Sequence, residues 1–132
     1  MVRKATVHIE TFRDGCESRL TDVLSAEAIT QAIKGLNGER AVTLTITPEG
    51  VDERLLVAVD GTHAFVGLER PDGLLRFAVG GRDASATRPF NIGGQEADIE
   101  IRCLLDLQTA ATVVVEWLAG GEQSAVGVWE RQ

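Results

Sequence analysis

The sequence predicts an α+β protein in which an antiparallel β-sheet meander carries two α-helices packed on one face. Two observations support this fold class. Short segments rich in valine, leucine, isoleucine and threonine follow one another through the middle of the chain, joined by turns that contain glycine. Two segments with apolar residues at helical spacing flank that run. Consecutive hairpins favour antiparallel pairing, and residues 1–132 are predicted to form one domain.

The first strand is expected at residues 4–12, with Val7 and Ile9 on one face. Residues 13–22 are predicted to be a loop because the segment is polar and contains an Asp-Gly turn signal. Residues 25–38 are predicted to be a helix with Ser25 as its N-cap and Gly38 just beyond its end. Its apolar stripe comprises Ala28, Ile29, Ala32, Ile33 and Leu36.

Residues 40–48 alternate strictly between apolar and polar side chains. This predicts a strand with Val42, Leu44 and Ile46 inward and Thr43, Thr45 and Thr47 outward. Further strands are expected at residues 54–60, 63–70 and 74–80, followed by a loop over 81–90. Residues 90–92 are expected to pair with 96–103 across a Gly-Gly-Gln turn.

The second helix is expected at residues 106–120, with Asp106 as its N-cap. Its apolar surface is wide enough to predict burial on more than one side; it includes Leu107, Ala110, Ala111, Val113, Val114, Trp117 and Leu118. Residues 125–130 are expected to form a short last strand, with Val126 and Val128 on one face and Trp129 on the other. We expect Trp129 to be buried where this strand closes the sheet.

The net charge is −7, from 20 acidic and 13 basic residues. This charge disfavours nucleic acid and anionic membranes as partners, and it favours a basic protein; it also promotes solubility. Neither a signal peptide nor a membrane-spanning run is apparent. Two cysteines are too few for a disulfide framework, so we expect a cytoplasmic protein with Cys103 buried and Cys16 exposed.

The chain carries no recognisable catalytic, metal or cofactor motif. His8 and His63 lie in strand-like segments without cysteine or acidic residues at metal-ligand spacing, so structural roles are expected for both. The glycine-rich segments resemble turns rather than phosphate-binding loops. We therefore expect no catalytic residues, no metal and no cofactor.

The most regular polar pattern is acidic. Glu96, Asp98 and Glu100 occupy one face of a predicted strand, where like charges repel one another. One interpretation is a solvated face that Arg76 or Arg88 neutralises from a neighbouring strand. The other is a patch that binds a basic protein. Three further acidic residues lie near hairpin tips, where turn chemistry is the simpler explanation; they are Asp60, Glu69 and Asp72.

The second half of the chain resembles a known family. The hairpin "FNIGGQEADIEI" is followed by a helix that opens near Asp106 and carries Ala110-Ala111, then by a glycine pair and a closing valine and tryptophan. The meander "LLVAVDGTHAFVGLERPDGLLRFAVG" precedes it. This order is similar to the Imm1 family of bacterial immunity proteins, small cytoplasmic α+β proteins of polymorphic toxin systems that are frequent in actinobacteria. The preference for arginine over lysine suits such a genome.

The resemblance implies a protein that binds and neutralises a cognate toxin without catalysis. Toxins that attack nucleic acids present basic active-site surfaces, to which an acidic inhibitor is complementary. We expect contacts first at Glu96, Asp98 and Glu100, and then at Asp60, Glu69 and Asp72. Two alternatives stay open: a small ligand-binding or enzymatic domain with a pocket between sheet and helices, and a homodimer or larger homo-oligomer that pairs exposed strand edges.

Overall fold

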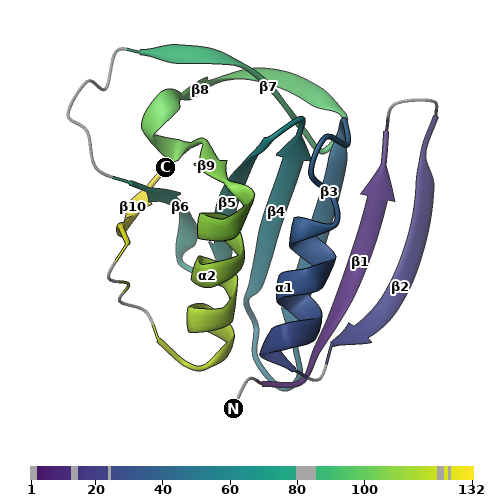
Figure 1. The fold of residues 1–132 in the computed structure, drawn as a ribbon. Coiled ribbons are helices and arrows are strands. Elements are labelled where there is room, and N and C mark those ends of the chain that lie inside the picture. The colour runs from purple at the N-terminus through teal and green to yellow at the C-terminus, as the bar shows by residue number, and fades with distance from the viewer. Residues whose placement is uncertain (1–2, 13–14, 24, 80–85, 122–123, 125) are drawn as a thin grey trace.

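The protein is built on one antiparallel sheet (Figure 1). The computed structural model describes residues 3–12, 15–23, 25–79, 86–121, 124 and 126–132. The strands lie in the order β10-β6-β5-β4-β3-β1-β2, and short β9 also pairs with β5. Their bounds are β1 (Ala5–Thr11), β2 (Glu17–Val23), β3 (Val42–Pro48), β4 (Arg54–Asp60), β5 (His63–Arg70), β6 (Gly73–Ala78), β9 (Leu105–Asp106) and β10 (Val128–Arg131). The predicted α+β fold class is confirmed.

Two helices, α1 (Ala26–Lys34) and α2 (Leu107–Leu118), pack side by side on one face of the sheet (Figure 1). Both predicted N-caps are present. The Ser25 hydroxyl accepts a hydrogen bond from the backbone N–H of Ala28, at 3.1 Å. The Asp106 carboxylate accepts one from the N–H of Thr109, at 2.7 Å, and this bond is the main reason why the pKa of Asp106 is lowered.

The core lies between the helices and the sheet. Val42, Leu44 and Ile46 are buried in it, as the alternation of β3 predicts, and Val7 and Ile9 join them from β1. The expected burial of α2 on more than one side is also confirmed; its buried residues are Leu107, Ala110, Ala111, Val113, Val114, Trp117 and Leu118. The extent of this packing explains how a helix containing three consecutive valines is held.

A hairpin covers part of the opposite, outer face of the sheet. It consists of β7 (Thr87–Ile92) and β8 (Gln95–Glu100), which form a separate two-stranded sheet. Phe90 is buried against Ala58 and Phe65, which point away from the helices. Thr43 belongs to the outer face, as predicted, but only 3% of it is exposed. Thr43 is buried there because the hairpin forms a partial third layer, which local alternation cannot reveal.

The largest correction is β2. Residues 13–22 were expected to be a loop, whereas residues 17–23 form a strand paired with β1 over its full length. The prediction failed because residues 17–22 are all exposed, so neither face of the strand carries an apolar stripe. Backbone hydrogen bonds to β1 hold this strand in place.

Several element boundaries also differ from the predictions. Helix α1 stops at Lys34, with Gly35 as its C-cap, although Gly38 does adopt the expected positive φ, 89°. Strand β8 stops at Glu100 and a short 3-10 helix, η1 (Ile101–Cys103), follows it. Strand β7 begins at Thr87, inside the predicted loop, of which residues 81–85 lie outside the described part. The last strand begins at Val128 rather than near residue 125.

The C-terminal tryptophan is only partly buried. Trp129 packs against the core, and its ring meets that of Phe77 edge-on with 5.1 Å between centroids. Val126 and Val128 are exposed. β10 therefore closes the sheet against β6, as expected, but it does so as an edge strand and leaves part of the indole accessible.

Both cysteines lie as expected. Cys16 is exposed, whereas Cys103 is buried, and burial raises the pKa of its thiol. Among the described residues, no helix has the length and apolar character needed to cross a membrane.

Candidate functional site

The hairpin β7–β8 is attached to the sheet by packing and by two hydrogen bonds near its tip. The Thr43 hydroxyl accepts a bond from the N–H of Gly93, at 3.1 Å, and the Asp60 carboxylate accepts one from the N–H of Asn91, at 3.2 Å. Gly93 and Gly94 have φ values of 62° and 88°, so the predicted Gly-Gly turn has the positive φ that it requires. The hairpin is thus held in one position on the outer face.

The outer side of β8 carries exposed acidic residues. Glu96 and Asp98 are both exposed, and they lie opposite Asn91 and Pro89 of β7, which carry no charge. Neither carboxylate forms an ion pair with any other described residue. Arg88, one of the two arginines expected to neutralise this face, lies opposite Ile99 on the side that faces the sheet. The negative charge of Glu96 and Asp98 is therefore directed to solvent, with no ion-pair partner among the residues that the structure describes.

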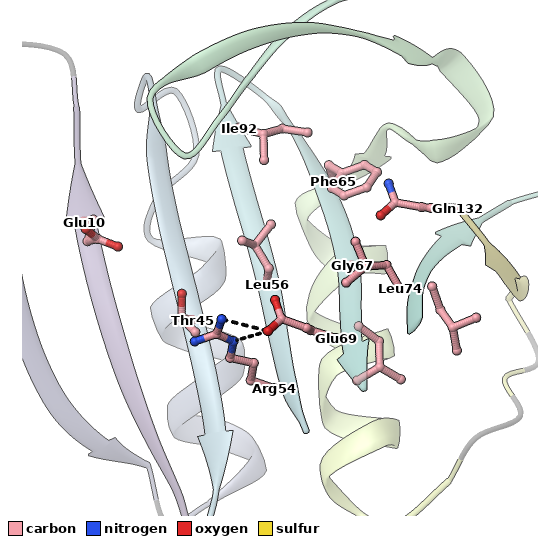
Figure 2. A pocket seen from close by; sticks show the side chains of 12 residues that line it. Glu10, Thr45, Arg54, Leu56, Phe65, Gly67, Glu69, Leu74, Ile92 and Gln132 are labelled. Carbon is pink, nitrogen blue, oxygen red and sulfur yellow. Dashed lines mark hydrogen bonds and ion pairs between the residues drawn. The ribbon is translucent and has the colours of Figure 1, made fainter. Parts of the chain in front are cut away.

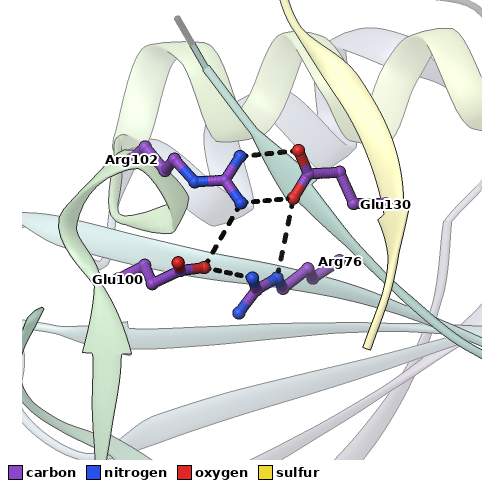
Figure 3. A network of polar contacts seen from close by, with 4 residues as sticks. All are labelled: Arg76, Glu100, Arg102 and Glu130. Atoms are coloured by element: carbon purple, nitrogen blue, oxygen red, sulfur yellow. Dashed lines mark hydrogen bonds and ion pairs between the residues drawn. The ribbon is translucent and has the colours of Figure 1, made fainter. Parts of the chain in front are cut away.

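Glu100 has a different environment (Figure 3). Its carboxylate pairs with Arg76 of β6 and, at 3.3 Å, with Arg102 of η1. Arg102 also binds both carboxylate oxygens of Glu130, at 2.6 and 2.7 Å, and this contact chiefly raises the pKa of its guanidinium. Side chains in this network are 15% to 27% exposed. The prediction that Arg76 neutralises the acidic strand is confirmed for Glu100. Its carboxylate contacts β6 and η1, whose arginines also bind Glu130 of β10, so Glu100 does not belong to the exposed patch.

Asp60 also serves the fold. Its side chain is 17% exposed. In addition to the bond from Asn91, it accepts a hydrogen bond from the backbone N–H of Ala41 and lies near the Arg40 guanidinium, both at 3.4 Å. Asp60 lies at the tip of the β4–β5 hairpin, as the sequence predicts, but each of its oxygens accepts a hydrogen bond, one from the start of β3 and one from the β7–β8 hairpin, so it is less available to a partner than Glu96 and Asp98.

The other two predicted contact residues are accessible but paired. Glu69 is 50% exposed and receives two contacts from Arg54, at 2.7 Å and 3.0 Å. Asp72 is 72% exposed and lies 3.7 Å from Arg131. Exposed pairs of this kind contribute little to stability, so either carboxylate can exchange its partner at small cost. The structure therefore brings together only Glu96 and Asp98 of the six predicted residues.

A groove lies beside the hairpin on the same outer face (Figure 2). Its volume is about 420 Å³. Leu56 and Gly67 are cross-strand neighbours in its floor, Ile92 approaches from the hairpin, and the Arg54–Glu69 pair crosses its lower end. Sequence reasoning missed this groove because its lining comes from strands β1, β3, β4, β5 and β6 as well as from β7. Gly67, a glycine inside a strand, was the only local signal.

The two histidines have ordinary polar contacts. His8 Nε2 forms a hydrogen bond with the Ser18 hydroxyl, and Nδ1 lies 3.7 Å from the Glu10 carboxylate. His63 Nδ1 contacts the Thr62 hydroxyl at 3.1 Å. In the part of the chain that the structure describes, no three histidine, cysteine or acidic side chains are placed to hold a metal ion.

Comparison with known proteins adds no family. No family model matches the chain, and no curated protein sequence matches it either. The similarity to the Imm1 family thus stays a prediction.

Proposed function

We propose that this protein is a non-catalytic immunity protein that binds and neutralises a basic bacterial toxin. The observation that carries the proposal is the pair of exposed carboxylates, Glu96 and Asp98, on the outer side of the β7–β8 hairpin. The net charge of −7 strengthens the field around them. The resemblance to the Imm1 family supports the same function, and the toxin active site is the surface that such an inhibitor covers.

The way in which the hairpin is held makes these carboxylates suitable for recognition. Phe90 of the hairpin points towards the sheet and is only 1% exposed. Asp60 and Thr43 accept hydrogen bonds from the hairpin backbone near its tip. Because the backbone of a strand that is already fixed loses little freedom on binding, complementary charges on a partner add to affinity and accelerate association. Their cross-strand neighbours are uncharged, so no ion pair with another described residue of this chain has to break before a partner binds.

The test is co-expression with the toxin encoded beside this gene. Glu96→Lys and Asp98→Lys, singly and together, should weaken rescue of growth and slow association, with the larger loss at low salt. Asp52→Lys is the matched control, because Asp52 is exposed in the turn at the opposite end of β3 and β4 and should change little. Full rescue by the double variant would contradict the proposal.

The groove favours a second candidate function, a small ligand-binding domain. Its volume of about 420 Å³ falls within the usual range for small-molecule sites, and apolar Leu56, Phe65 and Ile92 line it together with polar groups. Leu56→Trp would fill the groove without touching Glu96 or Asp98. Binding of a small molecule that Leu56→Trp abolishes and the Glu96 and Asp98 variants leave intact would favour ligand binding in the groove over toxin binding at the hairpin.

A further inference from the structure

Strand β2 forms one of the two edges of the main sheet (Figure 1). It has seven residues, whereas β10 at the other edge has four. The only strand paired with β2 in the described part of the chain is β1. Long, uncovered edges present unpaired backbone groups to other chains, and proteins normally shorten or cover them.

The hydrogen-bond pattern identifies which backbone groups of β2 are unpaired. The Phe12 N–H donates to the Ala41 carbonyl at 2.9 Å, and the Glu49 N–H donates to the Lys4 carbonyl at 3.0 Å. Because the direction of the backbone groups alternates along an antiparallel strand, the even-numbered residues of β1 also direct their N–H and C=O groups towards β3. Odd-numbered residues of β1 then point towards β2, where each lies opposite another odd-numbered residue. The backbone N–H and C=O groups of Ser18, Leu20 and Asp22 are consequently directed to the free edge.

The side chains of the same three residues share the outer face of the sheet. They lie opposite Glu10, His8 and Thr6 of β1, whereas the buried residues of β1 face the helices. Leu20, in the middle of the three, is 70% exposed, the largest exposure among the large apolar side chains of the described residues. An exposed leucine at the centre of an unpaired strand edge is the arrangement that a second strand would cover.

We propose that β2 pairs antiparallel with β2 of a second copy of this chain, about a two-fold axis that passes beside Leu20. In this register each Leu20 lies opposite Leu20 of the second copy, and each Ser18 lies opposite Asp22. By symmetry the register contains one Leu20–Leu20 pair and two Ser18–Asp22 pairs. The backbone groups in each of these three pairs are directed at each other, so every pair exchanges two hydrogen bonds. The two sheets thereby become one continuous sheet.

Complementarity of β2 with its own inverted copy points to a second copy as the occupant. Leu20 meets Leu20 of the second copy on the two-fold axis. On either side of the axis, the Ser18 hydroxyl of one copy meets the Asp22 carboxylate of the other. With His8 in the tautomer that carries its proton on Nε2, the Ser18 hydroxyl accepts from that N–H and its own O–H is available to donate to the Asp22 carboxylate. The three acidic or basic side chains of β2, Glu17, Arg19 and Asp22, oppose no like charge directly in this register.

Sedimentation velocity of the full chain tests the dimer. The proposal does not depend on toxin binding, so this experiment can fail without affecting the proposed function. We expect monomer and dimer to interconvert reversibly with a dissociation constant between about 1 µM and about 1 mM, because the interface is small. Leu20→Lys places two like charges opposite each other and should weaken the dimer roughly tenfold or more. Val128→Lys, at the exposed β10 edge, is the matched control and should leave the equilibrium unchanged.

Cysteine cross-linking tests the register. In a Cys16→Ser background, Leu20→Cys brings two cysteine Cα atoms to roughly 5.5 Å and should form an intermolecular disulfide on mild oxidation. Thr21→Cys separates them by roughly 8 Å, beyond the disulfide range, and should not. A monomer at every concentration would overturn the proposal, as would equal cross-linking of both variants. If the chain stays monomeric and Leu20→Lys abolishes toxin neutralisation, the edge binds the toxin instead and the dimer is wrong.

Discussion

Replacing Asp60 by asparagine should lower the free energy of unfolding by about 2 kcal/mol, although the side chain keeps its size. The carboxylate accepts hydrogen bonds from the N–H groups of Ala41 and Asn91 and lies beside Arg40. Asparagine has a single acceptor oxygen, so its amide group must face one of these donors. Bonds to a charged acceptor contribute roughly 1.5–3 kcal/mol each, and the lengths of 3.2–3.4 Å here place them at the lower end.

Chemical denaturation of wild type and Asp60→Asn measures this difference directly. For a chain of this size the expected loss corresponds to a drop of roughly 6–10 °C in Tm. The amide of Asn91 should also lose protection from hydrogen exchange, because it would lack its acceptor. Asp52→Asn, at an exposed turn position, is the control. A loss for Asp60→Asn below about 0.5 kcal/mol, or one equal to the control, would refute the assignment of Asp60 to the fold.

Two further variants test the packing of the C-terminal strand and the cap of α2. Trp129→Ala should lower the free energy of unfolding, measured by chemical denaturation, by about 2 kcal/mol. This loss is smaller than that expected for a fully buried tryptophan, because the indole is only partly buried against Phe77. A loss below about 0.5 kcal/mol would contradict the observed packing. Asp106→Ala should cost about 1 kcal/mol at neutral pH. Because folding lowers the pKa of Asp106, its ionised form stabilises the protein above the unfolded-state pKa of about 3.9, and this contribution disappears as pH falls through the lower folded-state pKa. The stability difference between wild type and Asp106→Ala should therefore shrink in acid, and a constant difference would argue against a charged cap.

Burial patterns and local turn chemistry could be predicted from the sequence because each depends on neighbouring residues. The alternation of Val42, Leu44 and Ile46 identified the helix-facing side of β3, and Ser25 and Asp106 marked the starts of both helices. The two glycines of the β7–β8 turn were recognised for the same reason. In each case the side chain or backbone preference is satisfied within a few residues of the position itself.

Only the tertiary structure decided which acidic residues remain available. Glu96, Asp98 and Glu100 look alike in the sequence, but Glu100 meets Arg76, 24 positions away, whereas the other two face uncharged neighbours. Asp60 is likewise occupied by the N–H of Asn91, 31 positions away. β2 escaped prediction because a strand exposed on both faces has no apolar pattern. Periodicity reports which face of an element is apolar, whereas charge pairing and strand edges depend on residues that are distant in the chain and become neighbours only on folding.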